Sequence, residues 1–270
     1  MKLVRKPSQA GRFYPAEIKQ LNEMLGCFIK TAESKKKALG VVSPHAGYVY
    51  SGKVAGLTLS SIQIPDRIII LGPNHTGYGA DTSIMNTGAW SMPQGSVPVD
   101  EELSNKLLIN GSKILRADVN AHSHEHSIEV QLPFLQYLNK NIRIVPICMR
   151  DYSLATCREL GRAIYETIKD IEGALIVASS DMTHYEPQEY AEIQDRKAIK
   201  KIIALDPDGL LYLVEKENIS MCGAGPVAAM LFAVKLLGAK KSELILYNTS
   251  GEASGDYSSV VGYAGIVVEG

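Results

Sequence analysis

Three short, mainly apolar runs that each lead into a histidine constrain the fold of this chain more than any other feature. The runs span residues 39–43, 67–71 and 174–178. Their length and their lack of apolar–polar alternation are typical of strands buried on both faces, as in parallel sheets. His45, His75 and His184 follow these runs within a few residues. Because ligands bind beyond the carboxyl ends of such strands, we expect the three histidines to face one region.

Charge and hydropathy exclude several classes of function. The 270 residues carry 28 basic and 29 acidic side chains, so no basic excess favours nucleic acid as a partner. No apolar run approaches the ~20 residues that span a bilayer, and the first residues lack the apolar core of a signal peptide. The four cysteines show no C-x-x-C spacing, which favours free thiols. We therefore expect a cytoplasmic protein that binds neither nucleic acid nor membrane.

Helical and strand patterns alternate along the rest of the chain. Apolar spacing predicts helices over residues 16–30, 54–62, 100–109, 128–138, 153–169, 187–204, 207–216 and 227–237. Further strands are expected over residues 82–86, 141–147, 242–249 and 260–269, the last two as an antiparallel pair, whereas residues 90–99 are expected to form a loop. We predict one α/β domain over residues 1–270, with a central mixed, mainly parallel sheet flanked by helices.

A glycine-rich segment imitates a nucleotide-binding loop. Residues 47–53 match the P-loop pattern up to Lys53, but Val54 stands where a Ser or Thr would bind magnesium. Tyr48 and Tyr50 would also crowd a backbone turn that encloses phosphate. We expect a turn from strand to helix here, and no nucleotide site.

Five side chains that follow strands or precede a helix form the candidate site: His45, His75, Asp181, His184 and Cys222. In a first interpretation, His45 and His75 hold a metal ion together with a third, anionic ligand. Imidazoles with a carboxylate suit non-haem iron, and imidazoles with a thiolate suit copper, iron or zinc. Asp181 would then orient the ligands, and His184 would exchange protons with a bound substrate.

A second interpretation makes Cys222 a nucleophile, as in a hydrolase. Cys222 precedes a predicted helix, whose amino end stabilises a thiolate. His184 would be its base, and Asp181 would orient the base. We rank this interpretation lower because it leaves His45 and His75 without a role.

Three further histidines lie close together at residues 122, 124 and 126. Their spacing of two residues is too tight for one rigid helical metal site, so we expect His122 and His124 to belong to an exposed polar segment. His126 and Glu129 are three residues apart at the start of a helical pattern. They either line the pocket or cap the helix.

Several short motifs, in the same order, resemble those of the MEMO family. They are AGRFY at residues 10–14, PHAGY at 44–48, GPNH at 72–75, EHSIE at 125–129, SSDMTH at 179–184 and MCG at 221–223. The resemblance covers almost the whole chain, from near residue 8 to residue 265. The compact chain resembles the prokaryotic branch, which is labelled component B of the AmmeMemoRadiSam system.

The resemblance implies a fold similar to the class III extradiol dioxygenases of the LigB type. It implies His45, His75 and Cys222 as ligands of a metal ion, with Asp181 and His184 as further pocket residues. Cys222 departs from the two-histidine, one-glutamate set that those dioxygenases use for iron, which argues against ring cleavage. The family also implies iron or copper as cofactor, zinc as a substitute, and a partner of the radical-SAM or AMMECR1 type.

Two functional hypotheses follow. The first is a metal-binding protein with a dioxygenase-like pocket, in which iron or copper supports redox chemistry on a small molecule. The second is a metal-free binding protein that holds a peptide or an anionic group through its imidazoles, the helix amino end and Tyr48, Tyr50 or Tyr185, or that uses the same pocket as the partner of a radical-SAM protein. The first predicts that substitution of His75 abolishes metal binding, whereas the second predicts ligand binding that survives a chelator.

Overall fold

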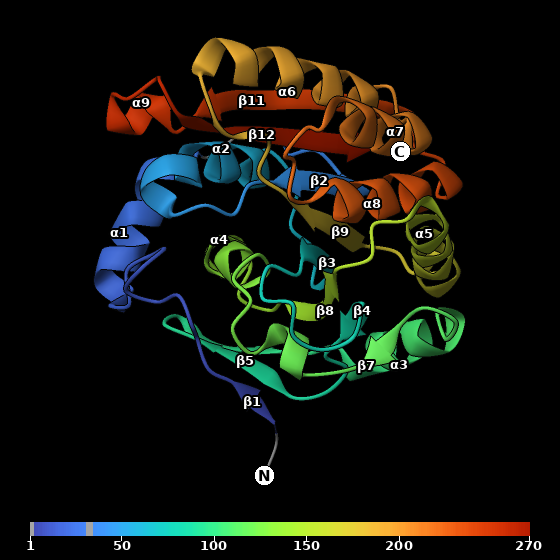
Figure 1. The fold of residues 1–270 in the computed structure, drawn as a ribbon. Coiled ribbons are helices and arrows are strands. Elements are labelled where there is room, and N and C mark those ends of the chain that lie inside the picture. Colours follow the sequence, from blue (N-terminus) through green and yellow to red (C-terminus); the bar gives the residue numbers. More distant parts are fainter. Residues whose placement is uncertain (1–2, 31–34) are drawn as a thin grey trace.

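A mixed sheet runs through the middle of the protein in this computed structural model, which describes residues 3–30 and 35–270 (Figure 1). The strands follow the order β10-β12-β2-β9-β3-β8-β4-β7, and β11 pairs with the other side of β12. The bounds are β2 (Gly40–Ser43), β3 (Arg67–Pro73), β4 (Thr82–Ile84), β7 (Arg116–Ala117), β8 (Arg143–Met149), β9 (Ala174–Ser179), β10 (His184–Glu186), β11 (Lys241–Thr249) and β12 (Val260–Glu269).

The centre of this sheet is parallel. β2, β9, β3 and β8 are neighbours and all run in the same direction, whereas β12 is antiparallel to both β2 and β11. The four central strands are buried almost throughout, which explains why they contain continuous apolar runs. The predicted α/β fold with a mixed sheet is confirmed, and so is the antiparallel pairing of the last two strands.

Helices cover both faces of the sheet (Figure 1). One face packs against α1 (Ile18–Phe28), α2 (Tyr48–Ser60) and α4 (Leu132–Leu138). The other packs against α3 (Glu101–Asn110), α5 (Leu154–Ile168), α6 (Gln188–Ile203), α7 (Pro207–Glu217) and α8 (Ala224–Leu236). Alternate residues of β3 face the two sides of the sheet, Ile68 and Ile70 the side of α1, α2 and α4, and Ile69 and Leu71 the side of α5 and α8. In the two described stretches, no helix is long and apolar enough to cross a bilayer.

The segment that we expected to be a loop, residues 90–99, forms most of a hairpin, so that prediction is wrong. β5 (Ala89–Met92) and β6 (Gly95–Pro98) pair antiparallel, and β1 (Val4–Arg5) adds a parallel strand to make a small second sheet. Trp90, Met92 and Val97 point into the core, and Gly95 follows the turn directly, with a φ of 124° that favours glycine. The alternation of buried and exposed residues is too short to be recognised in the sequence, because each strand has only four residues.

Helix α2 begins at Tyr48, six residues before the predicted start, and contains most of the segment that imitates a P-loop. The glycines of this helix serve packing instead of phosphate binding. A Cβ on Gly52 would lie 2.5 Å from an atom of Phe28, and one on Gly56 would lie 2.6 Å away. Phe28, the last residue of α1, therefore packs closely on α2 only because these two positions have no side chain. The expectation of a turn from strand to helix is correct, with Gly47 as the N-cap.

A buried carboxylate, Glu129, fastens the N-terminal segment to the body of the protein. It pairs with Arg5 and accepts hydrogen bonds from the Ser8 N–H at 2.9 Å, the Gln9 N–H at 2.8 Å and the Tyr14 hydroxyl at 2.6 Å. Burial alone would raise the pKa of Glu129, but the charge of Arg5 and these hydrogen bonds hold it below the ordinary value. Glu129 is therefore a structural anchor and does not line a pocket.

Removal of this anchor should destabilise the fold strongly. Glu129→Ala leaves the buried guanidinium of Arg5 without its counter-charge, so we expect a loss of about 3–5 kcal/mol in the free energy of unfolding. Glu252→Ala is the matched control, because it removes a carboxylate from an exposed pair with Lys53 and should cost at most ~1 kcal/mol. Urea unfolding of both variants tests this, and equal small losses would contradict the anchoring role.

Candidate metal centre

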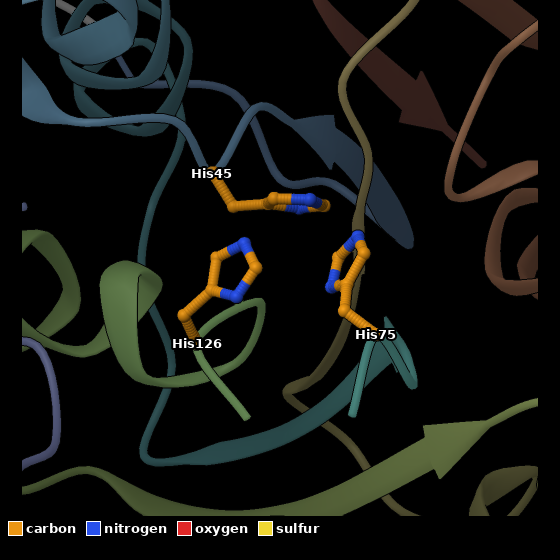
Figure 2. A group of neighbouring side chains, drawn as sticks. All are labelled: His45, His75 and His126. Atoms are coloured by element: carbon orange, nitrogen blue, oxygen red, sulfur yellow. The ribbon is translucent and has the colours of Figure 1, made fainter. Parts of the chain in front are cut away.

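Three imidazoles meet beyond the carboxyl ends of the central parallel strands (Figure 2). His45 follows β2 and His75 follows β3, two strands separated only by β9. His126 comes from the loop before the 3-10 turn Glu129–Gln131. One ring nitrogen from each histidine lies within 4.8 Å of the others, so this group could hold a metal ion.

Burial keeps the imidazoles of His45 and His126 neutral. His45 is 1% exposed, and burial, followed by the neighbouring His126 and His75, lowers its pKa well below the ordinary value. Burial also lowers the pKa of His126 to about 4, although the negative charge of Glu125 partly raises it. The rings of His75 and His126 stack with centroids 4.5 Å apart, an arrangement that two imidazolium ions would avoid. A neutral imidazole has the lone pair that a metal ion requires.

Glu125 orients two of the three rings. Its carboxylate accepts a hydrogen bond from Nδ1 of His75 at 2.9 Å, and it lies 3.3 Å from Nδ1 of His126. It also accepts the backbone N–H groups of His75, His126 and Ser127, at 2.6, 2.9 and 2.9 Å. Burial would raise the pKa of Glu125, but the histidines and these N–H groups lower it to about 2. A carboxylate that holds Nδ1–H of His75 leaves Nε2 as the free donor atom of that ring.

Glu125 is not among the site residues that the sequence predicts. The signal that could have found it is a carboxylate placed directly between two histidines, at residues 124 and 126. The expectation that His122 is exposed is wrong. The 3-10 turn Asn120–His122 directs His122 into the interior, where it is fully buried with its ring centroid 6.0 Å from that of Trp90. His124 is exposed, as expected.

Asp181 lies directly behind His45. One carboxylate oxygen accepts the backbone N–H of His45 at 2.8 Å, and the Asp181 N–H points at the sulfur of Cys222, 3.3 Å away. Burial raises the pKa of Asp181 to about 6, although the His45 N–H and the charges of His184 and His75 oppose the rise. A carboxyl group with this pKa can hold or release a proton near neutral pH.

His184 is the first residue of β10, a short strand that the sequence analysis did not predict. Its backbone N–H donates to the Ser220 hydroxyl, and its Nδ1 lies 2.8 Å from the Ser220 carbonyl oxygen. A carbonyl only accepts, so Nδ1 carries the ring proton of the neutral form and Nε2 is free to accept another. His184 is half-buried and influences the pKa of Asp181, which places the two side chains in one electrostatic environment.

Cys222 touches the cluster from the side. It lies just before α8, and its sulfur is 3.3 Å from Nε2 of His45. Burial, with the charge of Asp181, raises the pKa of the thiol, so the metal-free protein holds it protonated. The structure therefore brings all five predicted side chains to one edge of the sheet. His126 joins His45 and His75 in the closest group of ligand atoms, while Cys222 contacts His45.

Aromatic residues surround this edge of the sheet. Tyr185 is 77% exposed and has a φ of 59°, a left-handed conformation that is rare outside glycine. Tyr50 is 44% exposed, and both rings influence the pKa of the buried Tyr263 near Asp181. Tyr48, which we considered as a ligand-binding residue, is instead buried, and its hydroxyl donates to the Val130 carbonyl.

Comparisons with known proteins agree with these observations. A family model described as Memo-like protein matches residues 5–267. A MEMO1 family protein of Methanopyrus kandleri is 46% identical, over 97% of this chain and 98% of its own, and one of Methanocaldococcus jannaschii is 43% identical over 100% of both. The fold resembles the crystal structure of an uncharacterized protein from Escherichia coli K12, with a TM-score of 0.59 at 14% identity over 87% of this chain and 100% of that one.

Acidification should destabilise the metal-free protein through the cluster. The pKa of His126 is about 4 in the folded protein and 6.5 in an unfolded chain, so stability is full above pH 6.5 and falls as the pH drops toward 4. The loss should reach roughly 3 kcal/mol for this group. Urea unfolding at several pH values measures it, and His126→Gln should flatten the curve. Equal slopes in the two proteins would rule out His126 as the source.

Proposed function

The chain belongs to the Memo-like protein family, and from its histidine cluster we propose that it binds one redox-active transition-metal ion, iron or copper. The observation that carries the proposal is the meeting of imidazole nitrogens within 4.8 Å of one another at the carboxyl edge of a parallel sheet. Ligand sites of open α/β sheets lie at this edge.

The chemistry of the donor atoms fits such an ion. Imidazole nitrogen binds iron, copper and zinc, and Glu125 supplies the carboxylate that commonly holds the outer nitrogen of a metal-bound histidine. A bond length of ~2.1 Å places two nitrogens of one ion at most ~4.2 Å apart, so the group needs only a small contraction. Zinc would fit the same donor atoms as a substitute.

The orientation of the rings favours Cys222 over His126 as the third ligand. A lone pair lies in the plane of its ring, so two rings on one ion need planes that cross at the ion. The planes of His45 and His75 cross at 72°, whereas those of His75 and His126 are within 23° of parallel. The sulfur of Cys222 lies 3.3 Å from Nε2 of His45, a normal separation for two ligands of one ion. We therefore propose His45, His75 and Cys222 as ligands, with His126 packed on His75.

A bound iron or copper ion would supply a redox centre with open coordination positions. The protein would supply proton transfer beside it. The carboxyl group of Asp181, with a pKa of about 6, can take up and return a proton, and Nε2 of His184 can accept one. These two groups would act on a small molecule held at the open positions, in a pocket similar to that of the class III extradiol dioxygenases.

One observation favours a second candidate function, the binding of a peptide or an anionic group without a metal ion. Tyr185 is 77% exposed in a strained backbone conformation beside His184, and such strain is commonly found at binding sites. This candidate predicts that ligand binding survives a chelator but weakens in Tyr185→Ala. The metal hypothesis predicts that the chelator abolishes it.

His75→Ala should abolish stoichiometric metal binding, because it removes a ligand and leaves the fold in place. His124→Ala is the matched control, since His124 belongs to the same histidine-rich part of the chain but is exposed and outside the cluster. Metal content by mass spectrometry, on protein purified without oxygen, measures the difference. Full metal content in His75→Ala, or none in the native protein after iron and copper are offered, would refute the assignment.

A comparison of Cys222→Ser with His126→Ala identifies the third ligand. If the sulfur binds, Cys222→Ser should weaken binding more than His126→Ala, and about one proton should leave per ion bound, because the thiol must ionise. Calorimetry in two buffers with different ionisation enthalpies counts this proton. If His126→Ala is the variant that loses the ion, and no proton is released, the ligands are the three histidines.

A further inference from the structure

Ser179, the last residue of β9, lies beneath His45 and has three hydrogen-bond partners. Its hydroxyl is 2.6 Å from the carbonyl oxygen of Ser127, 2.8 Å from Nε2 of Gln131 and 2.9 Å from Nδ1 of His45. The side chains of Ser179 and Gln131 are fully buried, so water does not compete for these contacts. The position of each proton in this group can therefore be deduced from which atoms are able to donate a hydrogen bond and which only accept one.

The hydroxyl of Ser179 has one proton and two lone pairs. The Ser127 carbonyl only accepts, so it takes the hydroxyl proton in the shortest of the three contacts. The amide nitrogen of Gln131 also faces the carbonyl oxygens of Pro44 at 2.9 Å and Ser43 at 3.2 Å, so it is the nitrogen, not the oxygen, that points toward Ser179, and its two shorter contacts are those to Ser179 and Pro44. One lone pair of the Ser179 hydroxyl thus accepts the N–H of Gln131, and the other remains to accept a hydrogen bond from Nδ1 of His45.

His45 must then donate from Nδ1, and its proton cannot also be on Nε2 in the neutral ring. We propose that Gln131 and Ser179 are positioning residues that hold His45 in the Nδ1–H tautomer, with the lone pair of Nε2 directed at the metal position. Glu125 does this for His75 through a charge, whereas His45 is held by an uncharged relay. The role of this relay in metal binding rests on the proposed function, whereas the hydrogen bonds that set the tautomer are present without a metal ion.

The contact with Cys222 fits the same assignment. Its sulfur is 3.3 Å from Nε2 of His45, and a protonated thiol can donate there only if Nε2 carries no proton. In the opposite tautomer, Nε2–H would face the thiol and the other histidines, and no lone pair would be available for an ion. The relay therefore determines whether His45 can bind a metal before any metal is present.

Nitrogen NMR of metal-free protein with 15N-labelled histidine reads the tautomer directly. In the native protein we expect the proton of His45 on Nδ1, and in Ser179→Ala we expect a large population with the proton on Nε2. Metal affinity should fall about 10–100-fold in Ser179→Ala and recover in Ser179→Thr, which restores a hydroxyl. Ser43→Ala is the matched control, because Ser43 is also buried at the end of a central strand but its hydroxyl has no partner among the described residues.

The native spectrum alone decides the proposal if Ser179→Ala does not fold, since a His45 proton on Nε2 would overturn it. Gln131→Met offers a second test, because loss of the amide donor frees Ser179 to reorient and should raise the Nε2–H population. A spectrum of Ser179→Ala with the proton still on Nδ1 would also overturn the proposal. Absence of metal binding in the native protein would refute the proposed function, but it would leave the tautomer result standing.

Discussion

The hydrogen bonds accepted by the buried carboxylate of Glu125 hold together the loops from which the candidate site is built. Three of its donors are backbone N–H groups, from His75 on one loop and from His126 and Ser127 on another. A fourth donor is the ring of His75 itself. One charge thus sets the distance between two loops, the direction of an imidazole and its tautomer. An apolar side chain at this position would leave these N–H groups without an acceptor, which costs stability at each of them.

The sheet determines where the loops that Glu125 connects lie. Parallel strands end at the same edge, so the loops after β2, β3 and β9 meet there whatever their sequences are. A second buried carboxylate, Glu129, adds the N-terminal segment to the same edge, and the ring of Phe13 from that segment lies 4.9 Å from the ring of His126. Two carboxylates only four residues apart therefore serve different purposes, one in the site and one in the fold.

Metal binding at this edge would depend on the absence of charge on the imidazoles. Burial keeps His45 and His126 neutral, while hydrogen bonds to Ser179 and Glu125 leave Nε2 of His45 and His75 free. The protonated thiol of Cys222 and the carboxyl group of Asp181 lie next to His45, so the groups that could exchange protons are beside the groups that would hold the ion. This arrangement would serve the proposed function, in which electron transfer and proton transfer would occur together.

The sequence by itself determined the α/β fold, the antiparallel end of the sheet, and the family, because continuous apolar runs and short ordered motifs are local properties of the chain. It also predicted that His45, His75 and Asp181 share one edge, since each follows a parallel strand, whereas His184 reaches that edge as part of β10 and Cys222 from the start of α8. The hairpin at Trp90, the burial of His122 and the different roles of Glu125 and Glu129 were decided only by the tertiary structure. Glu125 and Glu129 act on partners far away in the chain, His75 and Arg5, and no local pattern specifies such a partner. The two strands of the hairpin are neighbours in the chain, but each is too short for its apolar–polar alternation to be recognised in the sequence.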